Sequence, residues 1–431
     1  MGMARILIAT IGSLGDLHPY MAVALGMQAR GHSVTIATNR LHRSRVVSAG
    51  LPWADLRPEA PDHPAPDLMA RAMDPARGPR FVFETTIAPA VRDQVADLLA
   101  ASPGMDLLVS TPLSLGIPLV AERLGLPWAS VVLQPMGLFS ATDPPVPPQI
   151  AWAAPLQRLG WLAGAPLRFA AHRVMRRWGR PVRALRREMG LSYRADPLGV
   201  DGFSPLLNLA MFSPLLAQPQ RDWPPGTRQT GFAFYDAPDP DGPPSPELEA
   251  FLQAGPAPVV FTLGTAAVHA ARRFYLDSLE AAGIIGQRAL LLTGTDPQGL
   301  PAPLPDWALA VPYAPHAAIF PRACAVVHQG GAGTTGQALR AGRPMLVVPF
   351  AHDQPDNAAR MQRAGLARVL PIGSYTADRA AASLRAILAD GRMAAQADLA
   401  GRQVRAEDGV RSACDALESV LTPRSPSPAP A

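Results

Sequence analysis

Two glycine-rich turns, each between a short apolar strand and a helix, most strongly constrain the fold of this 431-residue chain. The first turn follows the apolar run Ile6–Ala9, and the second follows Ala325–Val327. A buried strand that turns directly into a helix opens a β-α-β unit, in which the strands are parallel and helices cover both faces of the sheet. The sequence therefore predicts an α/β fold with doubly wound sheets.

The first forty residues form one complete unit of this kind. After strand Ile6–Ala9, Pro19 is expected to open a helix that Gly31 closes, and Val34–Thr38 is the next strand. The turn places Asp16 ahead of the helix, at the carboxyl edge of the sheet, where open α/β folds bind ligands. A general base fits that position, and so does a carboxylate that caps the helix.

The alternation of strands and helices stops once and then restarts. Between Pro219 and Pro246 the chain is dense in proline and aspartate, which is typical of a linker. Short apolar runs resume after it. We therefore expect a first Rossmann-like domain over residues 1–220, a linker over 221–250, a second Rossmann-like domain over 251–421 and a disordered tail over 422–431.

The positive charge of the chain is concentrated in one segment. The sequence pI is about 9.7, yet ten of the 39 basic residues and one of the 34 acidic ones fall between Ala151 and Arg194. The rest is slightly acidic, so nucleic acid is not the expected partner. Within this region, residues 157–187 form either a solvated helix face or a peripheral contact for anionic lipid or an acidic partner.

Other composition features bound the setting of the protein. Cys324 and Cys414 cannot build a disulfide framework, which fits a reducing, cytoplasmic location. No leader peptide and no apolar stretch of about 20 residues is expected. Asp239-Pro240-Asp241 imitates a metal-binding motif but lies in the linker, and His63, His172 and His269 form no spaced cluster, so no metal site is expected.

The second glycine-rich turn carries the strongest chemical signal. It reads His328-Gln329-Gly330-Gly331-Ala332-Gly333-Thr334-Thr335-Gly336. Glycines expose backbone N–H groups at a helix start, and the hydroxyls and the histidine add donors, which together suit a diphosphate. A purely structural glycine-rich turn is the alternative.

Three further groups end strands at the same edge of the second domain. Gly264 and Thr265 could contact the same phosphates or simply cap a helix. Tyr313, in the run that ends at His316, offers a ring on which a base could stack, or ordinary packing. Asp353 and Gln354 bring a carboxylate and an amide together, a pair that suits the vicinal hydroxyls of a sugar.

Together these residues resemble the GT-B sugar-nucleotide glycosyltransferases, in the family of plant and bacterial UDP-glycosyltransferases. The resemblance rests on Gly12-Ser13-Leu14-Gly15-Asp16, on Thr262-Leu263-Gly264-Thr265 and on the run from Tyr313 through His328 to Gln354. It implies two Rossmann-like domains that face each other across a cleft, acceptor in the first and nucleotide sugar in the second, with no cofactor or metal. The donor-binding residues it implies are Gly12, Ser13, Gly264, Thr265, Tyr313, His316, His328, Gly331, Gly333, Thr334, Thr335, Asp353 and Gln354.

The resemblance also marks a departure at the catalytic position. Asp16 stands where plant members carry a catalytic histidine, and Thr111 stands where they carry the aspartate that orients it. A lone Asp16 would then take the proton of the acceptor, as in bacterial relatives, and His18 could assist. Acceptor contacts are expected from His18, Thr111, Met136 and Phe139.

The expected activity is an inverting, metal-independent hexosyl transfer to a hydroxyl of a lipophilic small molecule. UDP-glucose is the first choice of donor and dTDP-rhamnose the second. Two alternatives stay open: a GT-B nucleotide-sugar epimerase or hydrolase, which needs no apolar acceptor groove, and a non-catalytic partner protein that retains the fold.

Overall fold

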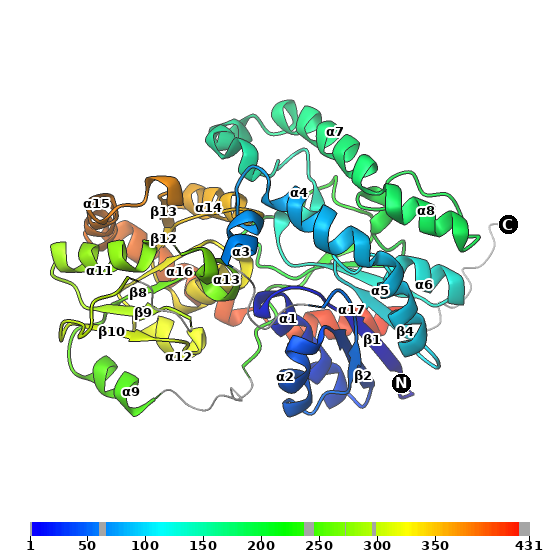
Figure 1. Cartoon of the computed structure of the whole chain (residues 1–431), viewed down its shortest axis with the longest axis horizontal. Coiled ribbons are helices and arrows are strands. Elements are labelled where there is room, and N and C mark those ends of the chain that lie inside the picture. Colours follow the sequence, from blue (N-terminus) through cyan, green and yellow to red (C-terminus); the bar gives the residue numbers. More distant parts are fainter. Residues whose placement is uncertain (1, 60–65, 237–244, 272, 295–298, 422–431) are drawn as a thin grey trace.

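The computed structural model describes residues 2–59, 66–236, 245–271, 273–294 and 299–421. Within these ranges it contains one seven-stranded and one six-stranded parallel sheet, side by side and each covered by helices (Figure 1). Asp239-Pro240-Asp241, His63 and the tail 422–431 lie outside the described residues, and nothing is described of the His269 side chain.

Both sheets have the strand order of a doubly wound fold. The first runs β3 (Trp53–Asp55), β2 (Ser33–Thr38), β1 (Arg5–Ala9), β4 (Leu107–Ser110), β5 (Trp128–Val132), β6 (Leu207–Ala210), β7 (Thr227–Gln229). The second runs β10 (Ala308–Val311), β9 (Ala289–Leu292), β8 (Val259–Thr262), β11 (Ala325–His328), β12 (Met345–Val347), β13 (Ala367–Val369). The predicted α/β fold with two Rossmann-like sheets is confirmed. In each sheet the order reverses at one point, β1/β4 and β8/β11, where such folds bind ligands.

The helices cover the faces of these sheets because the inner strands are apolar on both sides. The first half contains α1 (Leu14–Ala29), α2 (Arg43–Ser48), α3 (Pro66–Ala72), α4 (Gly78–Val82), α5 (Ala88–Ala101), α6 (Ile117–Leu124), α7 (Trp161–Trp178) and α8 (Arg180–Glu188). The second half contains α9 (Pro246–Gln253), α10 (Gly264–Ala267), α11 (Phe274–Ile284), α12 (His316–Ile319), α13 (Ala332–Ala341), α14 (Gln354–Arg363), α15 (Ala377–Leu388), α16 (Gly391–Ala406) and α17 (Gly409–Leu421).

The expected domain boundaries need two corrections. Residues 227–229, placed in the linker, form strand β7, which pairs with β6, and Phe232 is buried in the core behind it. Helix α17, assigned to the second domain, packs against α1 of the first. Arg30 holds it through Asp415 at 2.6 Å and Glu418 at 2.8 Å. The first boundary was hard to predict because β7 is a short edge strand within a proline-rich stretch. The second was hard to predict because nothing in the order of the elements indicates that the last helix packs on the first domain.

Helix α1 begins at Leu14, five residues before the predicted start at Pro19. The N–H of Leu17 already bonds the carbonyl of Ser13 at 3.0 Å. Pro19 therefore lies inside the helix, where its missing N–H leaves the carbonyl of Gly15 without its usual helical donor. Among the described residues, no helix is both long and apolar enough to cross a membrane.

Candidate active site between the two domains

The amino-terminal ends of α1 and α13 meet between the two domains. A Cβ built on Gly333 would lie 3.7 Å from the Cα of Gly15. Both helices start directly after a strand at the reversal point of its sheet. The first turn of a helix has N–H groups without helical partners and a partial positive charge, so two facing helix starts attract an anion.

Asp16 lies in the first turn of α1 with its carboxylate folded back on the preceding turn. Its Oδ2 accepts the N–H of Ser13 at 2.8 Å and the hydroxyl of Ser13 at 3.0 Å. A Cβ on Gly12 would lie 2.3 Å from the same oxygen, so this site needs glycine. Burial raises the pKa of Asp16, although the bonds from Ser13 lower it. The carboxylate therefore fits both readings at once, since it caps the helix and is a stronger base than an exposed aspartate.

His42 supports this turn and carries no signal in the sequence. Its Nε2 lies 2.9 Å from the carbonyl oxygen of Gly12, which can only accept, so Nε2 carries the hydrogen. The side chain is buried, and burial lowers the pKa of His42 while the charge of Asp16 acts against this. His42 therefore fixes the turn that positions Asp16.

Thr111 does not bond Asp16 directly. Its hydroxyl accepts the N–H of Leu113 at 3.2 Å, and it is buried at the end of β4. Tyr20 is buried near both residues: burial and then the charge of Asp16 raise the pKa of its hydroxyl, while Thr111 lowers it. Thr111 thus packs behind the carboxylate of Asp16, and its hydroxyl is engaged with the N–H of Leu113.

His328 presents a buried donor at the end of β11. Its Nδ1 accepts the N–H of Gly330 at 3.1 Å, and burial, together with His316, lowers the pKa of His328 to about 3. The ring is therefore neutral and Nε2 carries the hydrogen. Among the described residues this Nε2 has no partner, although it is fully buried. A buried N–H group without an acceptor lowers the stability of the folded protein, and a ligand that accepts its hydrogen bond removes this cost.

The glycine-rich turn continues into α13 earlier than predicted. The helix starts at Ala332, because the N–H of Thr335 already bonds the carbonyl of Gly331 at 2.9 Å. The free N–H groups are therefore those of residues 332–334. Thr334 retains slight exposure, but Thr335 is fully buried with a hydroxyl that has no partner in the described chain.

The turn after β8 lies directly beside this one. Thr262 and His328 are register partners in neighbouring strands, and the N–H of Gly264 bonds the hydroxyl of Thr262 at 3.2 Å. Gly264 has a positive φ of 64°, and a Cβ there would lie 2.5 Å from Nε2 of Gln329. Gln329, which sequence reasoning did not select, therefore packs between the two turns, and Thr265 is exposed beyond them.

Asp353 faces the first domain from the start of α14. Its Oδ2 accepts Nδ2 of Asn357 at 2.7 Å, and the same nitrogen donates to the carbonyl of Gly330 at 2.9 Å. Burial, with a further contribution from the charge of Asp16, raises the pKa of Asp353 from 3.8 to about 7. The charge of Asp16 in the first domain thus acts on Asp353 in the second. Asn357 is a second residue that the sequence did not reveal.

The side chain of Gln354 has a different role from that of Asp353. Its side-chain oxygen accepts the N–H groups of Phe350 at 2.9 Å and Ala351 at 3.2 Å, and the residue is almost fully buried. Asp353 and Gln354 were expected to bind the hydroxyls of a sugar together. The amide oxygen of Gln354 is instead engaged by the turn before α14. His352 stabilises this turn from outside through Nε2, 3.0 Å from the carbonyl of Ala72 on α3.

Three further predicted residues, His18, His316 and Tyr313, make ring contacts or are partly exposed. His18 stacks on Tyr235 at 5.0 Å, His316 stacks on Phe320 at 4.4 Å, and burial with the charge of His18 lowers the pKa of His316 to about 4. Tyr313 follows β10 and is 40% exposed.

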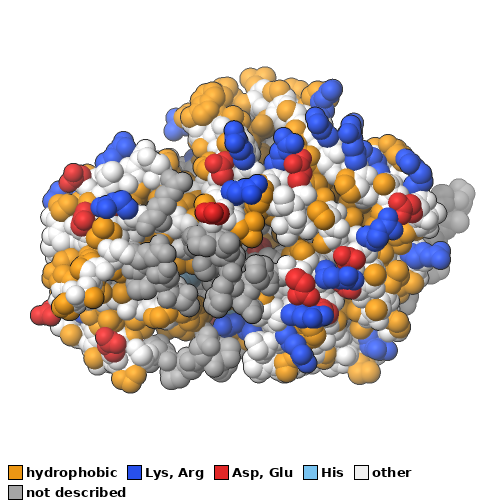
Figure 2. All heavy atoms as spheres, viewed as in Figure 1, with side chains coloured by type: hydrophobic (Ala, Val, Ile, Leu, Met, Phe, Trp, Pro, Cys, Tyr) orange, Lys and Arg blue, Asp and Glu red, His pale blue; other side chains and the backbone are white. Residues whose placement is uncertain are grey.

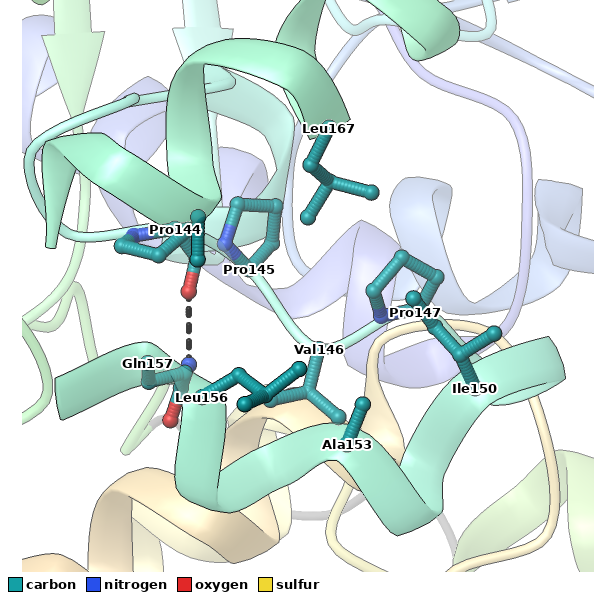
Figure 3. Close-up of a pocket in the computed structure, with 10 residues that line it drawn as sticks. Pro144, Pro145, Val146, Pro147, Ile150, Ala153, Leu156, Gln157 and Leu167 are labelled. Carbon is teal, nitrogen blue, oxygen red and sulfur yellow. Dashed lines mark hydrogen bonds between the residues drawn. The ribbon is translucent and has the colours of Figure 1, made fainter. Parts of the chain in front are cut away.

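Met136 and Phe139 follow β5 at the carboxyl edge of the first sheet. Met136 is half-buried in a short 3₁₀ turn, and Phe139 adopts a positive φ of 50° that directs its ring toward His172 of α7, 6.0 Å away. Beyond them, an apolar pocket opens between the 3₁₀ segment Pro148–Leu159 and α7 (Figure 3). Its lining includes Pro144, Pro145, Val146, Pro147, Ile150, Ala153, Leu156 and Leu167.

A buried ionic network holds the wall of this pocket to the second domain. Arg360 on α14 donates Nε to Asp356 at 2.9 Å and also pairs with Asp143 of the first domain. The other oxygen of Asp356 accepts the N–H of Val146 at 3.0 Å and the amide of Gln157 at 3.2 Å. Helix α14, which follows Asp353, therefore also holds the loop that lines the neighbouring pocket.

Comparisons with known families match both halves of the chain. Residues 6–133 match the glycosyltransferase family 28 N-terminal domain, and residues 291–411 match the C-terminal domain of erythromycin biosynthesis protein CIII-like proteins. Among solved structures, the glycotransferase of kitacinnamycin aligns with a TM-score of 0.70 at 21% identity, over 98% of this chain and 100% of that one. Spinosyn rhamnosyltransferase SpnG complexed with thymidine diphosphate aligns with a TM-score of 0.68 at 21% identity, over 96% and 100%.

Characterised relatives match over nearly the full length. The chain is 36% identical to O-mycaminosyltylonolide 6-deoxyallosyltransferase of Streptomyces fradiae, over 96% of this chain and 97% of the relative. It is 31% identical to glycosyltransferase GtfE of Amycolatopsis orientalis, over 98% and 99%. These similarities include both helix starts that meet between the domains.

Proposed function

The chain belongs to the GT-B family of sugar-nucleotide-dependent glycosyltransferases, and from that premise we propose that it glycosylates a hydroxyl of a lipophilic natural product. The observation that carries the proposal is the meeting of α1 and α13, with Asp16 on one side and Asp353 and the orphan donor of His328 on the other. The relatives act on antibiotic-type acceptors by name, which supports this acceptor class.

The donor is a nucleoside diphosphate sugar. Its diphosphate would lie at the start of α13, bonded by the free N–H groups of residues 332–334, by Thr334 and by Nε2 of His328. The sugar would lie against Asp353. UDP-glucose was the first expectation, but the 6-deoxyallosyl relative and the thymidine diphosphate complex move our preference to a dTDP-deoxysugar.

Asp16 is the general base of the proposed reaction. Its carboxylate takes the proton of the acceptor hydroxyl while that oxygen attacks the anomeric carbon and the bond to the leaving diphosphate breaks. Attack opposite the leaving group inverts the anomeric centre. Burial raises the pKa of Asp16 and so makes it a better acceptor of a proton than an exposed aspartate.

The leaving diphosphate gains charge as the bond breaks. The facing helix starts and the neutral His328 are preorganised donors for that charge, so the proposed reaction uses no divalent cation. Acceptor contacts are proposed for Met136, Phe139 and His18, with the apolar pocket of Figure 3 beside them. A cytoplasmic location completes the proposal, and the free thiols of Cys324 and Cys414 are compatible with it.

The test separates this function from its two alternatives. The full chain is incubated with dTDP-rhamnose, UDP-glucose or UDP-GlcNAc, with and without a pool of macrolide and sterol alcohols, and nucleotide release and acceptor mass are followed. Acceptor-dependent release with a mass gain of one sugar supports transfer. Release without any acceptor supports a hydrolase, a changed sugar without release supports an epimerase, and absence of nucleotide binding supports a partner protein.

Asp378→Asn is the matched control for Asp16→Asn. Both aspartates lie in the first turn of a helix, but Asp378 is exposed at the start of α15. Transfer should be lost in Asp16→Asn and retained in Asp378→Asn. Full activity of Asp16→Asn would exclude the assigned base.

A further inference from the structure

Exposed apolar side chains gather over the 3₁₀ segment Pro148–Leu159 and the first half of α7. Trp152 is 79% exposed, Leu162 74%, Phe169 65% and Trp161 60%, and Leu156 and Leu159 are exposed beside them. Figure 2 shows hydrophobic side chains along the corresponding edge of the molecule. We call these six residues the apolar edge.

Helix α7 buries little of its surface and exposes large apolar side chains. Gly164 and Met175 are its only buried residues among those described, and a Cβ on Gly164 would lie 2.0 Å from the carbonyl oxygen of Ala141. Its outward face instead carries Leu162 and Phe169. Surface helices normally turn such residues to the core, so this face is expected to meet something apolar.

The same outward face becomes basic along the helix. Arg173 and Arg177 follow Phe169 at helical spacing, Arg176 is exposed beside them, and the guanidinium of Arg173 lies 5.7 Å from the ring centre of Phe169. Arg186, one of the arginines expected to contribute, does not, because it is buried against Glu122. The exposed surface of α7 thus combines large apolar side chains, which can enter a headgroup region, with neighbouring arginines, which can bind lipid phosphates.

No acidic residue occurs in the chain between Asp143 and Glu188. The acids closest to this face are already engaged: Asp143 pairs with Arg360, Asp222 with Arg168 and Glu188 with Arg92. Asp196 pairs with His172 at 2.6 Å. Within the described part of the chain, Arg173, Arg176 and Arg177 of α7 are exposed and form no ion pair.

We propose that the apolar edge and Arg173, Arg176 and Arg177 form a docking surface for an anionic lipid bilayer. The tryptophans, leucines and Phe169 would enter the headgroup region, and the arginines would bind lipid phosphates. A second copy of the chain fits less well, because a two-fold contact through this face would bring the same arginines together. This proposal does not depend on the proposed reaction.

Vesicle co-sedimentation of the full chain tests the surface. We compare vesicles of phosphatidylcholine with vesicles of equal parts phosphatidylcholine and phosphatidylglycerol, at low and high salt. The wild type should bind the anionic vesicles, and added salt should weaken binding. Leu162→Ser with Phe169→Ser, and separately Arg173→Gln with Arg177→Gln, should each reduce binding by roughly tenfold or more.

The control variant carries Leu399→Ser with Arg392→Gln, both exposed on α16 far along the chain. It should bind as the wild type does, and circular dichroism should show all variants folded. Absence of binding to anionic vesicles, or equal binding by edge and control variants, overturns the proposal. The proposal would also be overturned if light scattering showed a dimer for the wild type and the control variant but not for the edge variants, because the apolar edge would then be a protein interface.

Discussion

Gly15 and Gly333, one from each domain, lie against each other, with 3.7 Å between the Cα of the first and the Cβ position of the second. A side chain on Gly333 would extend from a Cβ that already touches the backbone of Gly15, whereas a Cβ on Gly15 would lie 3.5 Å from the hydroxyl of Ser13. The glycine at position 333 therefore lets the starts of α1 and α13 approach closely beside the proposed diphosphate site.

Replacing Gly333 by valine should block nucleotide binding without unfolding the protein. The position is exposed and its φ needs no glycine, so the larger side chain fills the anion site and causes little strain. Calorimetric titration with dTDP and UDP should show at least a tenfold loss of affinity, about 1.4 kcal/mol. Gly391→Val, at the start of α16 with open space around it, is the control that should keep full affinity.

Asp16→Asn should reduce transfer by about 10²–10⁴-fold and leave nucleotide affinity nearly unchanged. The amide oxygen can still accept the N–H of Ser13, so the start of α1 is retained while the base is lost. Steady-state kinetics and calorimetry on one preparation give both values. Loss of nucleotide affinity parallel to loss of rate would show that the carboxylate binds the donor instead.

Asp353 should make the stability of the protein depend on pH. Its pKa is raised to about 7 in the folded protein from an ordinary 3.8, so the stabilising contribution is complete below about pH 4 and is lost as pH rises to 7. Asp353→Asn, which is neutral at every pH, should lose that part of the dependence and exceed the wild type in stability above pH 7. Thermal unfolding of both proteins from pH 4 to 8 measures the difference, and identical pH curves would contradict the assignment.

His328→Gln should weaken binding of dTDP or UDP by roughly ten- to a hundredfold, the value of one lost bond to a charged group. Because the pKa of His328 is about 3, nucleotide affinity should show no step from this residue between about pH 5 and 8. His172→Gln serves as the control, since that ring contacts Asp196 and Phe139 and not the donor turn. Equal affinity of the two variants would remove His328 from the donor site.

Arg360→Met should destabilise the protein by about 3–5 kcal/mol, because it leaves the fully buried carboxylate of Asp356 without its cation, whereas Asp143 keeps Arg363. Denaturant unfolding measures this. Arg402→Met is a matched control on α16: its partner Asp398 is also four residues away, but the pair is exposed and should cost less than about 1 kcal/mol. Adding Asp356→Asn to Arg360→Met should restore part of the loss.

The architecture was predictable from the sequence because its signals are local. Short, continuously apolar runs such as Ile6–Ala9 and Ala325–Val327 predict strands that are buried on both faces of a parallel sheet. The turns after such strands lie at the carboxyl edge of the sheet. The same logic brought Asp16, His328 and Asp353 toward one cleft. Even here, the start of α1 was misjudged, since Ser13 and Asp16 begin the helix before Pro19.

The partners of these residues depended on contacts between distant parts of the chain. His42 bonds Gly12, Asn357 joins Asp353 to Gly330, and Arg360 reaches Asp143 across 217 positions. None of these has a periodicity or motif of its own.

The sequence by itself determined the two doubly wound sheets and the residue types at their edges, since burial of an apolar strand depends mainly on the strand itself. Only the tertiary structure decided that Gly15 meets Gly333, that α17 returns to the first domain and that Leu162 and Phe169 of α7 are exposed. Such relationships depend on how two separately formed surfaces pack, and a local pattern contains no information about the surface it will meet.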